Sequence, residues 1–174
     1  MNKTIITDVD KYRKGWHGGR PETECGYGSM LSQTEIQRRW IPEMVEKYGI
    51  RSINDIGAGD LNWILHVEWP WPINYKGFDL VPRHELVKQF DLIHEVPPPA
   101  DLSMCLWLLN HLPVDHARLA QDNLMASGSK YVMVTWWDEM DDYLDLPAIE
   151  ETVIRTRSNR EGRVIDYWLR LVEC

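Results

Sequence analysis

The sequence predicts an α/β protein with a doubly wound, mostly parallel seven-stranded sheet that ends in an antiparallel hairpin. Three observations support this fold class. Short apolar strand candidates alternate with helix candidates along the chain, which is typical of a parallel sheet with helices on both faces. A glycine-containing turn follows the first strand candidate. Near the C-terminus, two β-rich runs flank a polar loop, which indicates a hairpin.

Length and composition indicate one globular domain. The chain has 174 residues, of which 44% are hydrophobic and 26% charged, so we expect a single domain over residues 1–174, with residues 1–48 as an N-terminal lid or helical segment. The net charge of −8 disfavours nucleic acid as a partner, because phosphodiesters repel an acidic chain. We expect no membrane insertion, since no apolar run approaches the roughly 18 residues that span a bilayer.

The cysteines and histidines give no indication of a metal site. Cys25, Cys105 and Cys174 lie far apart, and the six histidines show no ligand spacing, so we expect neither a disulfide framework nor a bound metal. The N-terminus turns acidic after two isoleucines, too early for a secretory signal. These features predict a cytoplasmic protein.

Residues 1–31 lack periodicity and are rich in glycine and proline, which indicates an irregular segment. Such a segment is either a functional lid or a loosely held terminus, and both interpretations stay open. Residues 32–35 predict a capping box for the helix that follows. Three apolar residues form one face of this helix: Ile36, Trp40 and Met44. We expect Pro42 to break or kink it and Gly49 to end it.

Four strand candidates lie between residues 51 and 106. The first contains Ile53 and Ile56, and the glycine turn after it leads to a helix candidate with Leu61, Ile64 and Leu65 on one side. Pro82 is expected to open a short helix that runs through Val87. The other three strand candidates are Ile73–Asp79, Phe90–Ile93 and Asp101–Leu106.

The remaining elements complete the sheet. We expect Asp115 to cap a helix with a buried face of Ala117, Ala120 and Leu124, stopped by Gly128. The apolar run Tyr131–Trp137 predicts the fifth strand. Residues 138–151 hold seven acids and no basic residue, which we interpret as a solvated loop rather than a metal site. The hairpin candidate pairs Thr152–Ser158 with Arg163–Val172.

The turn after the first strand carries the first chemical signal. Gly57 and Gly59 follow the acidic Asp55, and glycine allows a backbone to approach a ligand closely. Asp79 ends the next strand, at a spacing where doubly wound folds place an acid on a ribose diol. An adenosine-containing ligand is therefore expected. The third glycine of a dinucleotide fingerprint is missing and no Walker A sequence occurs, so dinucleotides and nucleoside triphosphates are disfavoured.

The segment Asp55-Ile-Gly-Ala-Gly-Asp60 resembles the first motif of class I S-adenosylmethionine-dependent methyltransferases, which have a Rossmann-like fold. Further segments resemble later motifs of that family, in the same order and spacing: Tyr75–Asp79, Asp91 to Leu102, Leu108–Pro113 and Ser127–Thr135, with Cys25–Ser29 similar to an element ahead of the core in one subgroup. The resemblance covers roughly residues 12–137. Leu61 departs from the pattern by replacing a frequent glycine, and the C-terminal third matches no family pattern.

The resemblance implies a role for each matching position. Asp55, Gly57 and Gly59 would hold the methionine part of S-adenosylmethionine, and Asp79 would hold its ribose. Leu80 would pack on the adenine, while Asp91 and Leu92 would bond its edge. Leu106 and Trp107 would line the pocket near the sulfonium. The product would be S-adenosylhomocysteine. Asp55, Asp79 and Asp91 have a simpler alternative as acids of turns and strand ends.

The acceptor is less defined than the methyl donor. His111 is the candidate general base, with a structural role as the alternative. We expect residues 12–31 and 136–170 to choose the acceptor, with five candidate contacts: Trp16, Tyr27, Ser29, Trp136 and Trp137. Core packing is an equal alternative for the last two. Arg155, Arg157, Arg160 and Arg163 favour a charged sheet edge, with an anchor for an anionic substrate as the minority interpretation.

A small-molecule acceptor is favoured, because the chain is acidic and lacks both a recognition domain and the motifs typical of DNA methyltransferases. The alternatives are a protein or nucleic-acid acceptor, an enzyme that uses the cofactor differently, and a regulatory or assembly protein that binds S-adenosylmethionine without methyl transfer.

Overall fold

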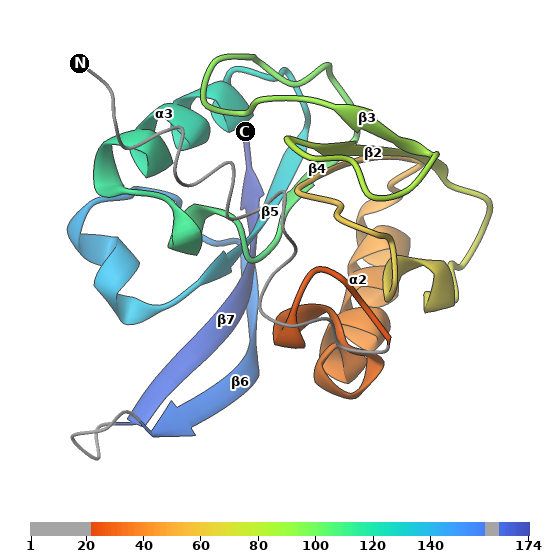
Figure 1. Ribbon diagram of the computed structural model, residues 1–174, viewed down its shortest axis with the longest axis horizontal. Helices are drawn as coiled ribbons and strands as arrows, with labels where there is room; N and C mark the ends of the chain where they lie inside the picture. Colours follow the sequence, from red (N-terminus) through yellow and green to blue (C-terminus); the bar gives the residue numbers. More distant parts are fainter. Residues whose placement is uncertain (1–21, 159–163) are drawn as a thin grey trace.

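The computed structural model describes residues 22–158 and 164–174 and contains one seven-stranded sheet in the order β3-β2-β1-β4-β5-β7-β6 (Figure 1). The first five strands are parallel, and β7 inserts antiparallel between β5 and β6. The predicted fold class is therefore confirmed. The strands are β1 Ser52–Ile56, β2 Asn74–Asp79, β3 Val87–Gln89, β4 Leu102–Cys105, β5 Tyr131–Trp136, β6 Glu150–Ser158 and β7 Val164–Glu173.

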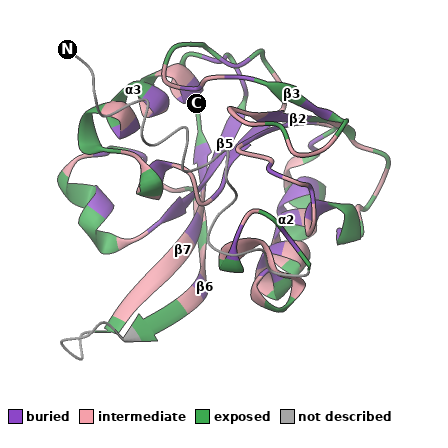
Figure 2. Cartoon of the chain, in the orientation of Figure 1, coloured by how far each residue is buried: buried purple, intermediate pink, exposed green. Residues whose placement is uncertain are grey.

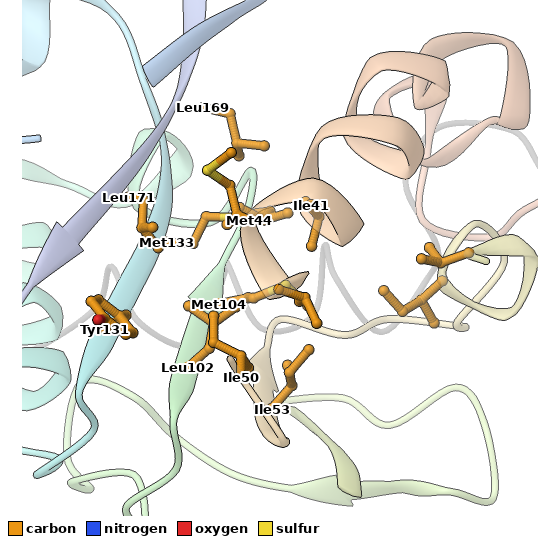
Figure 3. Close-up of a cluster of buried hydrophobic side chains, with 14 of the residues drawn as sticks. Ile41, Met44, Ile50, Ile53, Leu102, Met104, Tyr131, Met133, Leu169 and Leu171 are labelled. Atoms are coloured by element: carbon orange, nitrogen blue, oxygen red, sulfur yellow. The ribbon is translucent and has the colours of Figure 1, made fainter. Parts of the chain in front are cut away.

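In the described part of the chain, two α-helices cover opposite faces of the sheet, namely α2 Glu35–Tyr48 and α3 Val114–Met125. Helix α2 packs Ile41 and Met44 against the strand residues drawn in Figure 3, among them Met104, Met133 and Leu169. On the other face, Ala117, Ala120 and Leu124 of α3 belong to the same buried cluster as Val132 and Val134 of β5. The helical faces predicted for both helices are thus confirmed.

The ends of α2 differ from the expectation. Ser32 lies in a short 3₁₀ turn, Leu31–Gln33, and the residue before the helix is Thr34, whose hydroxyl bonds the carbonyl of Met30. The predicted capping box is therefore wrong. The helix also continues through Pro42 without a break, because buried residues on both sides of the proline hold it against the sheet. Gly49 ends the helix in the left-handed conformation, as expected.

The helix predicted after the glycine turn is absent. Leu61 has φ 60°, which interrupts any helix there, and the segment forms only a 3₁₀ turn at Ile64–His66. Leu61 and Ile64 are buried, but Leu65 is exposed. The connection from β1 to β2 therefore covers the sheet with a short turn rather than with an α-helix.

Two further predictions are corrected. No helix forms between Pro82 and Val87, and the third strand is Val87–Gln89 instead of Phe90–Ile93. Asp91 starts a turn by accepting the amide of Ile93, so the chain leaves the sheet there. Asp115 does not cap α3, which begins after Pro113, although it does lie in the first turn of that helix.

The hairpin of β6 and β7 extends past the rest of the sheet (Figure 1). Strand β5 pairs only with the second half of β7, from Trp168 to Glu173, so the first half of β7 projects beyond the carboxyl end of β5. Figure 2 shows the contrast between the buried central strands and this more exposed arm. The predicted hairpin loop at 159–162 lies outside the described residues. Within the described ranges, no helix is long and apolar enough to span a bilayer.

Candidate functional site

A cavity of about 440 Å³ lies at the carboxyl ends of β1 to β4. Its volume falls within the roughly 300–1,000 Å³ typical of small-molecule sites. Six of the described parts of the chain contribute to its walls. They are the N-terminal segment at Glu24–Ser29, the turn after β1, the ends of β2 and β3, the segment from Leu106 to Leu112, and the projecting hairpin. The predicted ligand-binding edge of the sheet is therefore hollow.

The glycine turn contributes bare backbone to this cavity. Gly57 and Gly59 have φ 86° and 60°, a region that side chains disfavour. The amides of Gly57 and Ala58 both donate to the carbonyl of Phe78, which ties the turn to β2. A Cβ on Gly59 would stand 2.4 Å from the sulfur of Cys25. Glycine is thus required at residue 59 both by conformation and by space.

Asp55 is the buried acid at this end of the cavity, with 4% of its surface exposed. Burial raises the pKa of its carboxyl to about 7, against the stabilising hydroxyl of Tyr75, which donates to it at 2.6 Å. The negative charge of Asp79 raises the pKa further. No cation pairs with Asp55 among the residues that the structure describes. A positively charged ligand group at this position would stabilise the carboxylate.

Asp79 ends β2 and holds the turn as well as facing the cavity. One carboxylate oxygen accepts the amide of Gly59 and the other accepts the amide of Val81, both at 2.9 Å. Burial raises the pKa of Asp79, and these two hydrogen bonds act in the opposite direction. Each carboxylate oxygen still has a lone pair for a ligand. Leu80 lines the cavity next to it.

Asp91 and Leu92 line the cavity beyond β3. The carboxylate of Asp91 accepts the amide of Ile93 and contacts His94 at 2.9 Å, while Leu92 is buried. Leu106 and Trp107 follow β4 and also line the cavity. Trp107 has φ 55°, and its amide donates to the hydroxyl of Thr135. That conformation directs the chain from β4 into the cavity wall.

The candidate acceptor residues separate into three groups. Tyr27, Ser29 and His111 line the cavity. Trp136 does not: it is 1% exposed in the core and donates its indole N–H to Asp141, so its packing alternative is the correct one. Trp137 is also absent from the wall and contacts Tyr167, with ring centroids 5.8 Å apart. Trp16 lies outside the described residues.

The sequence prediction missed part of the wall. Arg155, Arg157 and Tyr167 reach the cavity from the projecting hairpin. The two arginines carried a minority interpretation as a substrate anchor, whereas nothing local marks Tyr167, since strand pairing alone places it opposite Arg155. Arg160 and Arg163 lie outside the described residues.

The N-terminal segment packs across the glycine turn. Asp60 accepts the hydroxyl of Thr23 and the amide of Glu24 through one carboxylate oxygen, at 2.7 and 2.8 Å. Glu24 also pairs with Arg83 beyond β2. Burial raises the pKa of the Cys25 thiol to about 12, so it stays protonated and is no nucleophile at neutral pH. Within the described ranges, no cluster of three or more His, Cys, Asp or Glu residues could hold a metal.

Solved structures with low sequence identity share this architecture. Magnesium protoporphyrin IX methyltransferase from Synechocystis PCC 6803 matches with a TM-score of 0.61 at 13% identity, over 97% of this chain and 92% of that chain. The present protein has the class I methyltransferase fold. A second structure with this class I methyltransferase fold is 1,6-didemethyltoxoflavin-N1-methyltransferase from Burkholderia thailandensis, with a TM-score of 0.57 at 12% identity, over 97% and 85%. No protein-family model and no curated protein matches the chain.

Proposed function

We propose that this protein is an S-adenosylmethionine-dependent methyltransferase that acts on a small-molecule acceptor. One observation carries the proposal. One cavity is lined by a glycine turn, by the carboxylates Asp55 and Asp79 and by the aromatic rings of Trp107 and Tyr167, which suits a charged methyl donor beside an acceptor. Its position also supports the proposal, because open α/β sheets bind ligands at the carboxyl ends of their strands. Both solved structures described above are methyltransferases crystallised with S-adenosylmethionine or S-adenosylhomocysteine.

The residues at the acidic end fit the cofactor. Asp55 is a buried carboxylate without a cationic partner among the described residues, so the ammonium of the methionine part would supply the missing charge. Gly57 and Gly59 line the cavity, and the methionine part would lie along their backbone. Asp79 would accept the ribose hydroxyls, and Asp91 the exocyclic amine of adenine, with Leu92 donating its amide.

The apolar residues complete this part of the site. Leu80 would cover the adenine, and Leu106 and Trp107 would surround the sulfonium. S-adenosylmethionine supplies a methyl group on a positively charged sulfur, and transfer to a nucleophile leaves S-adenosylhomocysteine. The residues of this chain mainly align the acceptor and exclude water, so proximity supplies much of the rate. The segment from Glu22 to Gln33, fastened to Asp60, would act as the lid.

His111 is the proposed general base. It lies in the turn Leu109–His111 at the edge of the cavity, on the carboxyl side of β4. A base is required only when the acceptor must lose a proton during attack. His111→Ala should then slow turnover by a factor of roughly 10²–10⁴ and leave cofactor affinity unchanged. Full turnover by this variant would remove His111 from the mechanism.

Cavity size and charge favour a small acceptor. A volume of about 440 Å³ leaves room for a compact molecule, and the net charge of −8 opposes nucleic acid. The three free cysteines are consistent with a reducing compartment, from which we infer that the reaction takes place in the cytoplasm.

Calorimetry tests the proposal directly. Titration of the full chain with S-adenosylmethionine and S-adenosylhomocysteine should give one site per chain, and Asp55→Ala should weaken binding by at least about tenfold. Asp115→Ala, an exposed acid in α3, is the matched control and should bind normally. Absence of binding at millimolar ligand would contradict the proposal.

A second measurement separates an enzyme from a binding protein. The full chain is incubated with labelled S-adenosylmethionine and the small-molecule fraction of a cell extract, and S-adenosylhomocysteine is quantified. We expect release above the level of the Asp55→Ala variant. Cofactor binding without release would instead identify a regulatory or assembly protein.

A further inference from the structure

Two arginines line the cavity without a carboxylate partner. Arg155 and Arg157 lie on β6, and both face the same space as Asp55 and the glycine turn. Among the residues that the structure describes, no Asp or Glu oxygen lies within 4.0 Å of either guanidinium. Arg170 on the neighbouring strand differs, since it pairs with both Asp141 and Glu151. The two cavity arginines therefore have charge that the described protein does not neutralise.

The projecting hairpin brings these two arginines to the cavity. The hairpin projects past the carboxyl end of β5, the edge at which the cavity opens. The register of β6 shifts between Val153 and Arg155, and a bulge of this kind changes the direction of the following side chains. After the shift, Arg155 lies opposite Tyr167 and Arg157 opposite Ile165, so both arginines and Tyr167 share one face.

Burial and mutual repulsion make the positions of Arg155 and Arg157 energetically unfavourable in the absence of a ligand. Arg155 is half-buried, and both this burial and the positive charge of Arg157 lower its pKa. Among the described residues, its guanidinium donates a hydrogen bond to the neutral side chain of Gln33. Two adjacent cations, one of them partly desolvated, repel each other unless an anion lies between them. A bound anion is the group that would make this arrangement favourable.

Aromatic rings surround the same position. The guanidinium of Arg155 lies 4.7 Å from the ring centre of Trp107 and 5.4 Å from that of Tyr27, and Arg157 lies 5.7 Å from Tyr167. Trp107 and Tyr167 also contact each other, with centroids 5.4 Å apart. The indole N–H of Trp107 is buried and has no hydrogen-bond partner within the described ranges. Such walls favour a planar ligand.

The cavity is therefore electrostatically divided. Asp55 and Asp79 come from β1 and β2 and Asp91 follows β3, on one side of the sheet, which suits the positively charged methyl donor, whereas Arg155 and Arg157 come from β6 at the opposite edge. We propose that the methyl acceptor is a small aromatic anion whose charged group binds Arg155 and Arg157 and whose ring lies against Trp107 and Tyr167. This inference rests on the proposed function and names its substrate class. The planar guanidinium fork matches both carboxylate and phosphate, so the shared chemistry is that of an aromatic oxyanion.

The test uses matched acids and amides on the protein saturated with S-adenosylhomocysteine. Calorimetry compares 4-hydroxybenzoate with 4-hydroxybenzamide and 3-hydroxy-2-naphthoate with its amide. Phenyl phosphate is added to distinguish phosphate from carboxylate. We expect at least one anion to bind about tenfold or more tightly than its neutral counterpart or, for phenyl phosphate, than phenol. Equal binding within every pair, or no binding by any probe, would overturn the inference.

Variants assign the effect to the hairpin. Arg155→Gln and Arg157→Gln should each weaken the preferred anion by about tenfold while leaving the neutral counterpart and S-adenosylhomocysteine unaffected. Arg157 is exposed, so its replacement tests the inference even if Arg155→Gln perturbs folding. Arg39→Gln, an exposed arginine of α2 outside the cavity, is the control. An anion preference that survives both hairpin variants would contradict the assignment.

The outcomes separate the two proposals. If the unaltered protein does not bind S-adenosylhomocysteine, both the proposed function and this inference are overturned. Normal S-adenosylhomocysteine binding without a preference for anions would overturn this inference alone and would leave a methyltransferase with a neutral acceptor.

Discussion

Asp55 joins the stability of the protein to its proposed function. A carboxylate at the end of β1 is buried beside the negative charge of Asp79, and Tyr75 alone among the described side chains donates to it. Since the pKa of Asp55 is raised from 3.8 to about 7, the folded protein holds this proton more tightly than the unfolded chain. The contribution of protonated Asp55 to the free energy of unfolding is therefore present at low pH, and it is lost as the pH rises through 7.

Replacing Asp55 by Asn should therefore stabilise the ligand-free protein while impairing its site. The amide oxygen of Asn can still accept from Tyr75, but no charge is buried. At about pH 8 the free energy of unfolding should rise by roughly 1–3 kcal/mol, and the gain should shrink towards pH 5. Urea titrations at both pH values measure it, and affinity for S-adenosylhomocysteine should fall. A variant less stable than the unaltered protein at the higher pH would show that burial of the Asp55 carboxylate does not destabilise the fold.

A substitution at Gly59 tests how closely Cys25 of the N-terminal segment packs against the glycine turn. Gly59→Ala should destabilise the protein by roughly 2–3 kcal/mol, because it adds the strain of φ 60° to a contact of 2.4 Å with the sulfur of Cys25. Gly49→Ala is the control: its φ is 64°, but no atom lies within 4 Å of the added Cβ, so only the conformational cost of about 1 kcal/mol applies. Adding Cys25→Ala should recover part of the difference. Equal costs for the two glycines would disprove the steric contribution.

At the scale of elements, tertiary contacts override local preferences. Helix α2 passes through Pro42, although proline lacks the amide that would bond the carbonyl of Arg38. Ile41 and Val45, completely buried on either side, hold the helix on the sheet. At the glycine turn, the local backbone conformation decides the structure instead. Gly59 and Leu61 both have positive φ, and no α-helix follows them.

Pro42→Ala should stabilise the protein. The substitution restores one helical hydrogen bond and removes the clash of the proline ring, which together cost up to about 3 kcal/mol in a helix interior, so we expect a gain of roughly 1–2 kcal/mol in chemical denaturation. Glu43→Ala, at the exposed neighbouring position, should change stability far less. A loss of stability in Pro42→Ala would mean that the helix is shaped around the proline.

At the scale of the whole molecule, the C-terminal hairpin is part of the core and also part of the site. Strand β7 lies between β5 and β6, and Leu169 and Leu171 are fully buried beneath α2 (Figure 3). The other half of the same hairpin projects to the cavity and supplies Arg155 and Arg157. One element thus fixes the proposed acceptor end of the cavity relative to the sheet.

Leu169→Ala should destabilise the entire protein rather than release the hairpin. We expect a loss of roughly 2–5 kcal/mol, with far-ultraviolet circular dichroism and tryptophan fluorescence reporting a single coincident transition. Leu119→Ala, on the exposed face of α3, should have little effect. Two separate transitions would indicate that the hairpin folds independently of the parallel strands.

The sequence alone predicted the fold class, most of the strands and the residues proposed to bind the cofactor. Strand periodicity identified β1, β2, β4, β5 and the hairpin, because their apolar runs are long enough to be distinctive. The segment Asp55–Asp60 and the acid at Asp79 lie next to their own strands, so a local pattern contains the chemistry. Predictions from local patterns were wrong at the short elements. Asp91 turns the chain by a side-chain hydrogen bond to the amide of Ile93, and Leu61 turns it by its positive φ.

Only the tertiary structure decided which side chains line the proposed acceptor end of the cavity. Trp136 lies at the end of a strand like the pocket residues, but it faces the core, whereas Tyr167 and Arg155 face the cavity from the far end of the chain. Their orientation depends on strand pairing across β5, β7 and β6 and on the register shift before Arg155. These are long-range contacts, and a side chain's direction on a strand reverses with a shift of one residue. The residues of the proposed methyl-donor end therefore form a local sequence pattern, while those of the proposed acceptor end come together only once the sheet has formed.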